Sequence, residues 1–226
     1  MMAAIHWTTL TEVQSKPVHW FWGGRIPLGK VTLLDGEPGS GKSLLALDLA
    51  ARASRGLLMP LERGAAAPAA NVVLFNDDDN LSDTIRPRLE AAGADLTRIR
   101  SVDGPISITD VQDFRPSLII LDPLSVYLCL EGDMPPRTIL KNITRLARET
   151  NAAVLVVQSL AKESFRTDDI YDVARSVLRI STIGHGRQRV ALAKSNLIAV
   201  NEIPPLVYHF ESTPTAVKLA GWADSV

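Results

Sequence analysis

The fold is decided by Val31-Thr32-Leu33-Leu34, then Asp35, then Gly36-Glu37-Pro38-Gly39-Ser40-Gly41-Lys42-Ser43. The apolar run predicts a buried strand, and the eight residues from Gly36 match the pattern Gly-x-x-x-x-Gly-Lys-Ser/Thr in a strand-to-helix setting. In this pattern glycines let the backbone curl so that its N–H groups point at phosphate oxygens, and the following helix adds the positive end of its dipole. The stretch therefore predicts a nucleoside-triphosphate site.

Two side chains of this loop have expected roles. Lys42 should reach the β- and γ-phosphates, and the Ser43 hydroxyl should bind Mg²⁺. The alternative is a glycine-rich turn that merely joins a strand to a helix, and the flanking strand and helix patterns argue against it. The residues expected to surround the nucleotide are Glu37, Pro38, Gly39, Ser40, Gly41, Lys42, Ser43 and Leu44.

Strand and helix patterns alternate after the loop, which indicates an α/β fold with a mostly parallel sheet. Hydrophobic spacing predicts a helix from Lys42 to near Gly56 and a surface loop from Leu57 to Ala70. Further on, the patterns predict strands at 72–75, 98–102, 118–121 and 153–157 and helices at 81–89 and 136–147. From Val173 only strands are expected, at 173–180, 189–194 and 206–210, so the sheet should finish antiparallel.

The composition fits one domain with a sizeable core. The chain has 226 residues, of which 46% are hydrophobic, and a net charge of −1, so no overall basic field indicates a nucleic-acid partner. A single cysteine, Cys129, excludes an internal disulfide and is expected to be a small core residue. No apolar run approaches a membrane span and the start lacks a signal-peptide pattern, so a cytoplasmic protein without membrane contact is expected. Residues 1–30 are expected to form a lead-in, 31–160 the nucleotide-binding core and 161–226 the C-terminal strands.

Polar groups at three strand ends are candidates for catalysis. Asp122 follows the strand at 118–121, at the edge where α/β sheets bind ligands, so it is expected to hold Mg²⁺, partly through water. A turn aspartate before proline is the alternative. The acidic run at 77–79 follows another strand and is expected to orient or deprotonate the attacking water, unless Asp79 or Asp83 caps a helix instead. Gln158 ends the strand at 153–157 and is expected to sense the γ-phosphate, or else to satisfy backbone groups.

The segment 162–194 carries a net positive charge. Residues 162–194 hold seven lysines and arginines against four aspartates and glutamates, a local charge of +3. Such a region can supply an arginine to a neighbouring subunit's nucleotide or contact nucleic-acid phosphates, although a solvated strand is the simpler interpretation for any one arginine. The aromatic run Trp20-Phe21-Trp22 is expected to pack at the sheet edge. The four histidines are scattered and show no metal-ligand spacing.

Taken together, these motifs resemble the RecA-like ATPases of the RepA-type hexameric replicative helicase family. The resemblance covers nearly the whole chain. It is carried by Trp22-Gly23-Gly24-Arg25-Ile26-Pro27-Leu28-Gly29-Lys30, the phosphate loop, Asp83-Thr84-Ile85-Arg86-Pro87-Arg88-Leu89, Leu121-Asp122-Pro123-Leu124 and Lys194-Ser195-Asn196.

The resemblance implies residue roles. Lys42 and Ser43 match the Walker A pair and Asp122 matches Walker B, while Asp78 stands where the family usually has a catalytic glutamate. Gln158 and Ser159 stand where a pair including histidine is usual. Arg175 matches an arginine finger that acts across a subunit interface, which implies a ring or filament.

The resemblance implies an ATP- and Mg²⁺-dependent motor, with a hexamer favoured and single-stranded DNA as a partner. The interval from Lys162 to Arg175 is shorter than the family's usual DNA-binding segment. Two alternatives therefore stay open. One is a RecA-like regulatory or assembly ATPase without DNA translocation, and the other is a nucleotide-gated interaction module with weakened hydrolysis.

Overall fold

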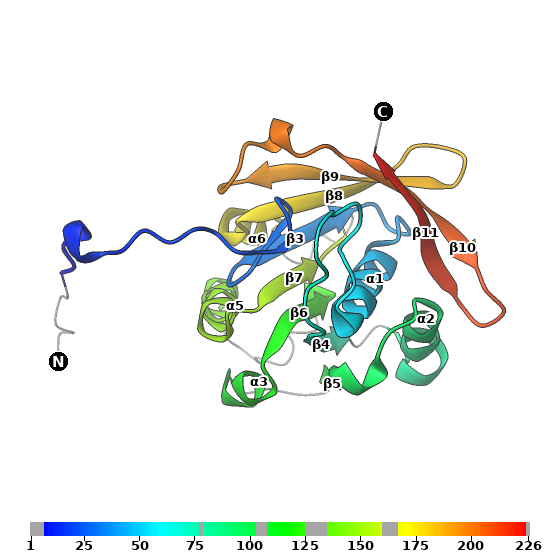
Figure 1. The fold of residues 1–226 in the computed structure, drawn as a ribbon, viewed down its shortest axis with the longest axis horizontal. Coiled ribbons are helices and arrows are strands. Elements are labelled where there is room, and N and C mark those ends of the chain that lie inside the picture. The colour runs from blue at the N-terminus through cyan, green and yellow to red at the C-terminus, as the bar shows by residue number, and fades with distance from the viewer. Residues whose placement is uncertain (1–6, 77–78, 103–107, 125–134, 160–166, 225–226) are drawn as a thin grey trace.

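A nine-stranded sheet runs through the part of the chain that the computed structural model describes, residues 7–76, 79–102, 108–124, 135–159 and 167–224 (Figure 1). Its spatial order is β11-β10-β9-β8-β3-β7-β6-β4-β5. The strands β8, β3, β7, β6, β4 and β5 are parallel, whereas β9, β10 and β11 continue the sheet antiparallel. The strands are β3 (Val31–Gly36), β4 (Asn71–Asn76), β5 (Ile99–Val102), β6 (Pro116–Asp122), β7 (Ala153–Val157), β8 (Ser176–Thr182), β9 (Arg187–Ser195), β10 (Leu206–Ser212) and β11 (Val217–Asp224). This α/β architecture confirms the predicted mixture of parallel and antiparallel strands.

Helices cover both faces of the sheet. On one face lie α1 (Lys42–Arg55) and α2 (Arg86–Ala91), and on the other lie α3 (Ile108–Phe114), α5 (Pro136–Thr150) and α6 (Thr167–Val173) (Figure 1). A small hairpin of β1 (Trp20–Trp22) and β2 (Ile26–Pro27) precedes β3. None of the helices in the described ranges combines the length and apolar character that crossing a bilayer requires.

The core has two layers because successive strand residues face opposite sides of the sheet. In β6, Leu118 and Ile120 pack toward α1, whereas Ile119 and Leu121 pack toward α5. Burial on both faces explains why the parallel strands are continuous apolar runs. Trp22 of the β1–β2 hairpin is fully buried in the α1 layer, which confirms the packing role expected for the aromatic run.

The helix that follows the phosphate loop has clear start and stop signals. It begins after Gly41, carries Arg52 and Arg55 in its last turn, and ends at Gly56, whose left-handed backbone closes the helix with hydrogen bonds to Ala53 and Arg52 carbonyls. Ten of its fourteen residues are buried, so it packs tightly against the sheet. The predicted bounds of this helix are confirmed.

The start of one predicted strand was wrong, and several other local features were not predicted. The strand expected from Val173 begins only at Ser176, because residues up to Val173 complete α6. Asn80, rather than Asp79 or Asp83, caps the helical segment at 81–91, since its side chain accepts a hydrogen bond from the Ser82 N–H. The sequence patterns also gave no expectation of α3 or β11. Cys129 lies outside the described residues.

Candidate functional site

The phosphate loop occupies the carboxyl end of β3 and the start of α1. Its two framing glycines are required sterically. Gly36 has φ 152°, and a Cβ there would lie 2.6 Å from the Ile180 carbonyl oxygen. Gly41 caps α1 with a left-handed φ of 87°, and a Cβ there would lie 2.4 Å from Cζ of Phe210. The loop therefore keeps its curled path only with glycine at both positions.

Lys42 is held inside the loop. Its ammonium donates to the carbonyl oxygens of Gly36 at 2.9 Å and Glu37 at 2.8 Å, and the residue is 9% exposed. Burial lowers the pKa of Lys42, while the nearby carboxylates of Asp122, Asp35 and Glu37 act to raise it. The positive charge sits at the place where a triphosphate would be cradled.

Strand pairing brings the other predicted groups to the same edge. Asp122 ends β6 and stands in register with Asn76 at the end of β4. Gln158 follows β7, the strand between β3 and β6, and its N–H donates to the Leu34 carbonyl at 3.0 Å. The edge thus gathers Lys42, Asp122 and Gln158. The predicted catalytic Asp78 lies outside the described residues.

Three buried polar atoms along this edge have no hydrogen-bond partner within the described part of the chain. They are the hydroxyl oxygens of Ser40 and Ser159 and the amide oxygen of Gln158. Ser40 is 3% exposed and Gln158 is 7% exposed. Because buried polar atoms are normally paired, unpaired ones at a phosphate loop fit a site that is completed by a polar ligand. The role of Gln158 as a γ-phosphate sensor stays a prediction.

The residues after Asn76 form a local network. The Asn76 amide donates to the Asp79 carbonyl at 2.6 Å, and Arg88 of α2 binds the Asp79 carboxylate at 2.8 Å. Asp79 therefore anchors α2 to the end of β4. Its carboxylate is engaged by an arginine, so its geometry is that of an anchor rather than of a free base.

An ion pair between a buried aspartate of β3 and a half-exposed arginine of β8 was missed by the sequence analysis. Asp35, 1% exposed, receives two hydrogen bonds from Arg179 of β8, Nε to Oδ1 at 2.8 Å and Nη2 to Oδ2 at 2.6 Å. The hydrogen bonds that Arg179 donates to this carboxylate raise the pKa of the Arg179 guanidinium. The available signal was Asp35 itself, because an acid inside a buried strand requires a partner. The pair fixes β8 to the residue that precedes the loop.

Arg175 lies at the opposite end of the sheet. Its N–H donates to the carbonyl of Val31, the first residue of β3, and its side chain is exposed. Val31 and Gly36 are five residues apart along β3, which at roughly 3.3 Å per residue separates the backbone of Arg175 from Gly36 by about 16 Å. The fold therefore does not bring Arg175 together with Lys42 of the same chain.

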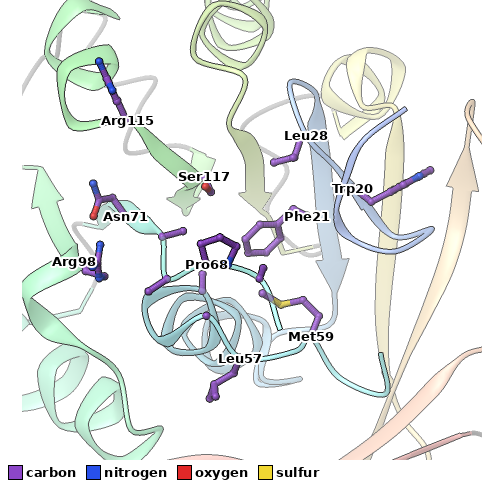
Figure 2. Close-up of a pocket in the computed structure, with 15 residues that line it drawn as sticks. Trp20, Phe21, Leu28, Leu57, Met59, Pro68, Asn71, Arg98, Arg115 and Ser117 are labelled. Carbon is purple, nitrogen blue, oxygen red and sulfur yellow. The ribbon is translucent and has the colours of Figure 1, made fainter. Parts of the chain in front are cut away.

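A cavity of about 340 Å³ opens at this opposite edge, between the amino ends of β4 and β6 and the end of α1 (Figure 2). Phe21, Met59 and Pro68 surround its centre, and Arg98 and Arg115 stand on one side. Its lining contains no residue of the phosphate loop. The cavity is thus separate from the predicted nucleotide site.

A phosphate loop after β3, together with an acidic end of β6 one strand removed from it, defines a RecA-like P-loop ATPase domain. A family model described as an AAA domain matches residues 4–164, well over half of the chain, and the chain belongs to that family. The crystal structure of a KaiC-like protein from Pyrococcus horikoshii superimposes with a TM-score of 0.58 at 18% identity, covering 91% of this chain and 100% of that one. This likeness shows the fold.

Sequence comparison also finds a DNA repair protein RadA from Mycolicibacterium smegmatis. It is 23% identical over 192 residues, which are 84% of this chain. The match covers 34% of that relative, so this chain spans about a third of its length. The RecA-like class is thereby supported, and the finer resemblance to RepA-type helicases stays a prediction.

Proposed function

We propose that this chain binds and hydrolyses ATP with Mg²⁺, as the motor domain of a ring of identical subunits, a hexamer, acting on single-stranded DNA. The observation that carries the proposal is the buried Lys42 ammonium, which the loop carbonyls hold near the carboxylate of Asp122. At the same sheet edge, Ser40 and Gln158 each have a buried polar atom that finds no partner among the described residues. A buried cation at the same edge as an unsatisfied hydroxyl donor is suited to a polyphosphate.

Each side chain at this edge has a proposed role. Lys42 exchanges its bonds to the loop carbonyls for the β- and γ-phosphate oxygens. Ser43 and Asp122 supply hard oxygen ligands of the kind that Mg²⁺ prefers. Bound Mg²⁺ neutralises charge on the phosphate oxygens. Gln158 and Ser159 bond the γ-phosphate, and Asp78 orients the attacking water.

Arg175 is proposed to act on the nucleotide of a neighbouring subunit. Its exposure at the edge opposite the phosphate loop supports this role, because a head-to-tail contact would bring the two edges together. Head-to-tail contacts close into rings when the rotation between subunits allows it. The ring proposal therefore rests on the separation of Arg175 and Lys42.

Single-stranded DNA is the partner proposed from the family resemblance and from the name of the DNA repair relative. The basic residues between 162 and 194 are the part of the chain best suited to phosphate contacts. The alternatives, a regulatory ATPase without translocation and a nucleotide-gated module, share the same nucleotide site. They differ in their response to DNA and in turnover.

The test is ATP hydrolysis with and without single-stranded DNA, together with particle mass by light scattering and Lys42→Ala as the blank. We expect a hexamer whose turnover DNA stimulates. A ring whose turnover is the same with and without DNA would favour the regulatory ATPase. Tight ATP binding with turnover equal to the blank would favour the gated module.

A further inference from the structure

The strand order determines toward which strands the nucleoside of a bound nucleotide extends from the phosphate loop. Asp122, proposed for Mg²⁺, and Gln158, proposed for the γ-phosphate, lie at the carboxyl ends of β6 and β7, which are on one side of β3. On the other side lie β8, β9, β10 and β11. A triphosphate whose γ end points toward β7 must direct its nucleoside toward the antiparallel strands.

An aromatic side chain lies on the side of the antiparallel strands. Phe210 of β10 contacts the phosphate loop directly, since a Cβ on Gly41 would meet its ring at 2.4 Å from Cζ and 2.6 Å from Cε1. Gly41 lacks that atom, so the ring edge rests against the loop backbone. Phe210 is only partly buried and keeps part of its surface beside the start of α1.

Other aromatic side chains of the core pack against the Phe210 ring. Tyr208, two residues earlier on the same strand and fully buried, meets the Phe210 ring edge-on at 6.1 Å between centroids. Tyr208 in turn packs on Trp222 of β11 at 4.7 Å, and Trp222 meets Trp22 at 6.1 Å. This aromatic row joins the loop to the core, which gives Phe210 little freedom to move. The β10–β11 hairpin that carries it lies along the flank of α1 (Figure 1).

We propose that Phe210 is the stacking platform for the nucleobase of the bound nucleotide. The inference rests on the proposed ATP site and adds the class of base that it takes. Stacking on a phenyl ring uses the π-face that every base has, and larger purine rings cover more of it. The platform should therefore favour purine over pyrimidine triphosphates while distinguishing little between ATP and GTP.

The test measures affinity for ATP, GTP, CTP and inorganic tripolyphosphate, each with Mg²⁺, for the unsubstituted chain and for Phe210→Ala. We expect the substitution to weaken ATP and GTP about tenfold or more, as stacking losses usually do, and to leave tripolyphosphate within about twofold. Phe210→Trp should restore purine binding, and Phe210→Leu, which keeps apolar packing without a planar face, should not.

The matched control is Phe114→Leu, a partly buried phenylalanine that packs in the other layer of the core. Thermal unfolding without nucleotide checks that each variant is folded. If Phe210→Ala weakens tripolyphosphate as much as ATP, the ring only supports the loop and the proposal is overturned. Unchanged ATP affinity overturns it too. Failure of the unsubstituted chain to bind ATP would instead overturn the proposed function.

Discussion

The two edges of the parallel sheet differ in how their charged groups are held. At the carboxyl edge, Lys42 and Asp35 are buried and bonded, and the buried amide oxygen of Gln158 finds no partner among the residues that the structure describes. At the amino edge, Arg175 is exposed to solvent. Preformed buried polar groups suit tight binding, whereas an exposed arginine suits contact with another molecule. The difference fits the proposal that one chain binds the nucleotide and a second chain supplies Arg175 for its hydrolysis.

The largest expected effect comes from Arg175→Ala. Arginine fingers contribute on the order of 10³–10⁵ in rate, so turnover of the assembled protein should fall by that factor while ATP affinity stays nearly constant. Steady-state hydrolysis and nucleotide titration measure the two quantities. Arg145→Ala, an exposed arginine on α5, is the control and should leave both unchanged.

Mixing variants sharpens this prediction. Subunits with Lys42→Ala keep an intact Arg175, and subunits with Arg175→Ala keep an intact loop. If the arginine acts between subunits, the mixture regains part of the turnover that each variant lacks alone. A mixture as inactive as its components would mean that the two edges do not meet in the assembly.

The next effect in the series is that of Lys42→Ala on turnover. Removing one preorganised group that stabilises transition-state charge costs at least about 10²–10³ in rate, which brings turnover to the baseline of the hydrolysis test. ATP affinity should fall as well because Lys42 is already in the loop. Turnover and the ATP-induced rise in melting temperature measure the loss. Lys30→Ala, at the residue directly before β3, is the matched control, and an equal loss there would show that the loop is not the site.

The sequence predicted which residues lie at the carboxyl edge of the sheet better than it predicted the contacts that hold this edge in place. The phosphate loop, Asp122 and Gln158 were found because each is marked by its immediate neighbours in the chain. The Asp35–Arg179 pair and the contact of Phe210 with Gly41 were missed because they join residues far apart, and strand order is set by the whole fold. β11 was missed for a similar reason, since Gly221 weakens its strand pattern and only pairing with β10 identifies it.

Arg179→Ala tests whether the carboxyl edge is preformed. Removing the arginine leaves the Asp35 carboxylate buried without its two donors, and breaking a buried pair usually costs about 3–5 kcal/mol. The half-exposed Arg179 side chain reduces this, so we expect about 2 kcal/mol in urea unfolding. Asp35→Asn with Arg179→Ala should cost less than the sum of the two single changes. Strict additivity would show that the pair contributes nothing as a pair.

The smallest effect concerns Asp48, a carboxylate in the second turn of α1. Burial raises its pKa, more than the 2.8 Å contact with Arg52 lowers it. A raised folded-state pKa means that its stabilising contribution is present below the unfolded value of about 3.9 and is lost as pH rises through the folded value.

Asp48→Asn, which removes the charge at every pH, should therefore stabilise the chain by less than about 1 kcal/mol near pH 7. The advantage over the parent should shrink as pH falls through the raised pKa, since the parent then becomes uncharged at this position too. Urea unfolding of both proteins between pH 4 and 8 measures the difference. An advantage that grows toward acid pH would mean that the Arg52 contact, and not burial, dominates at this helix.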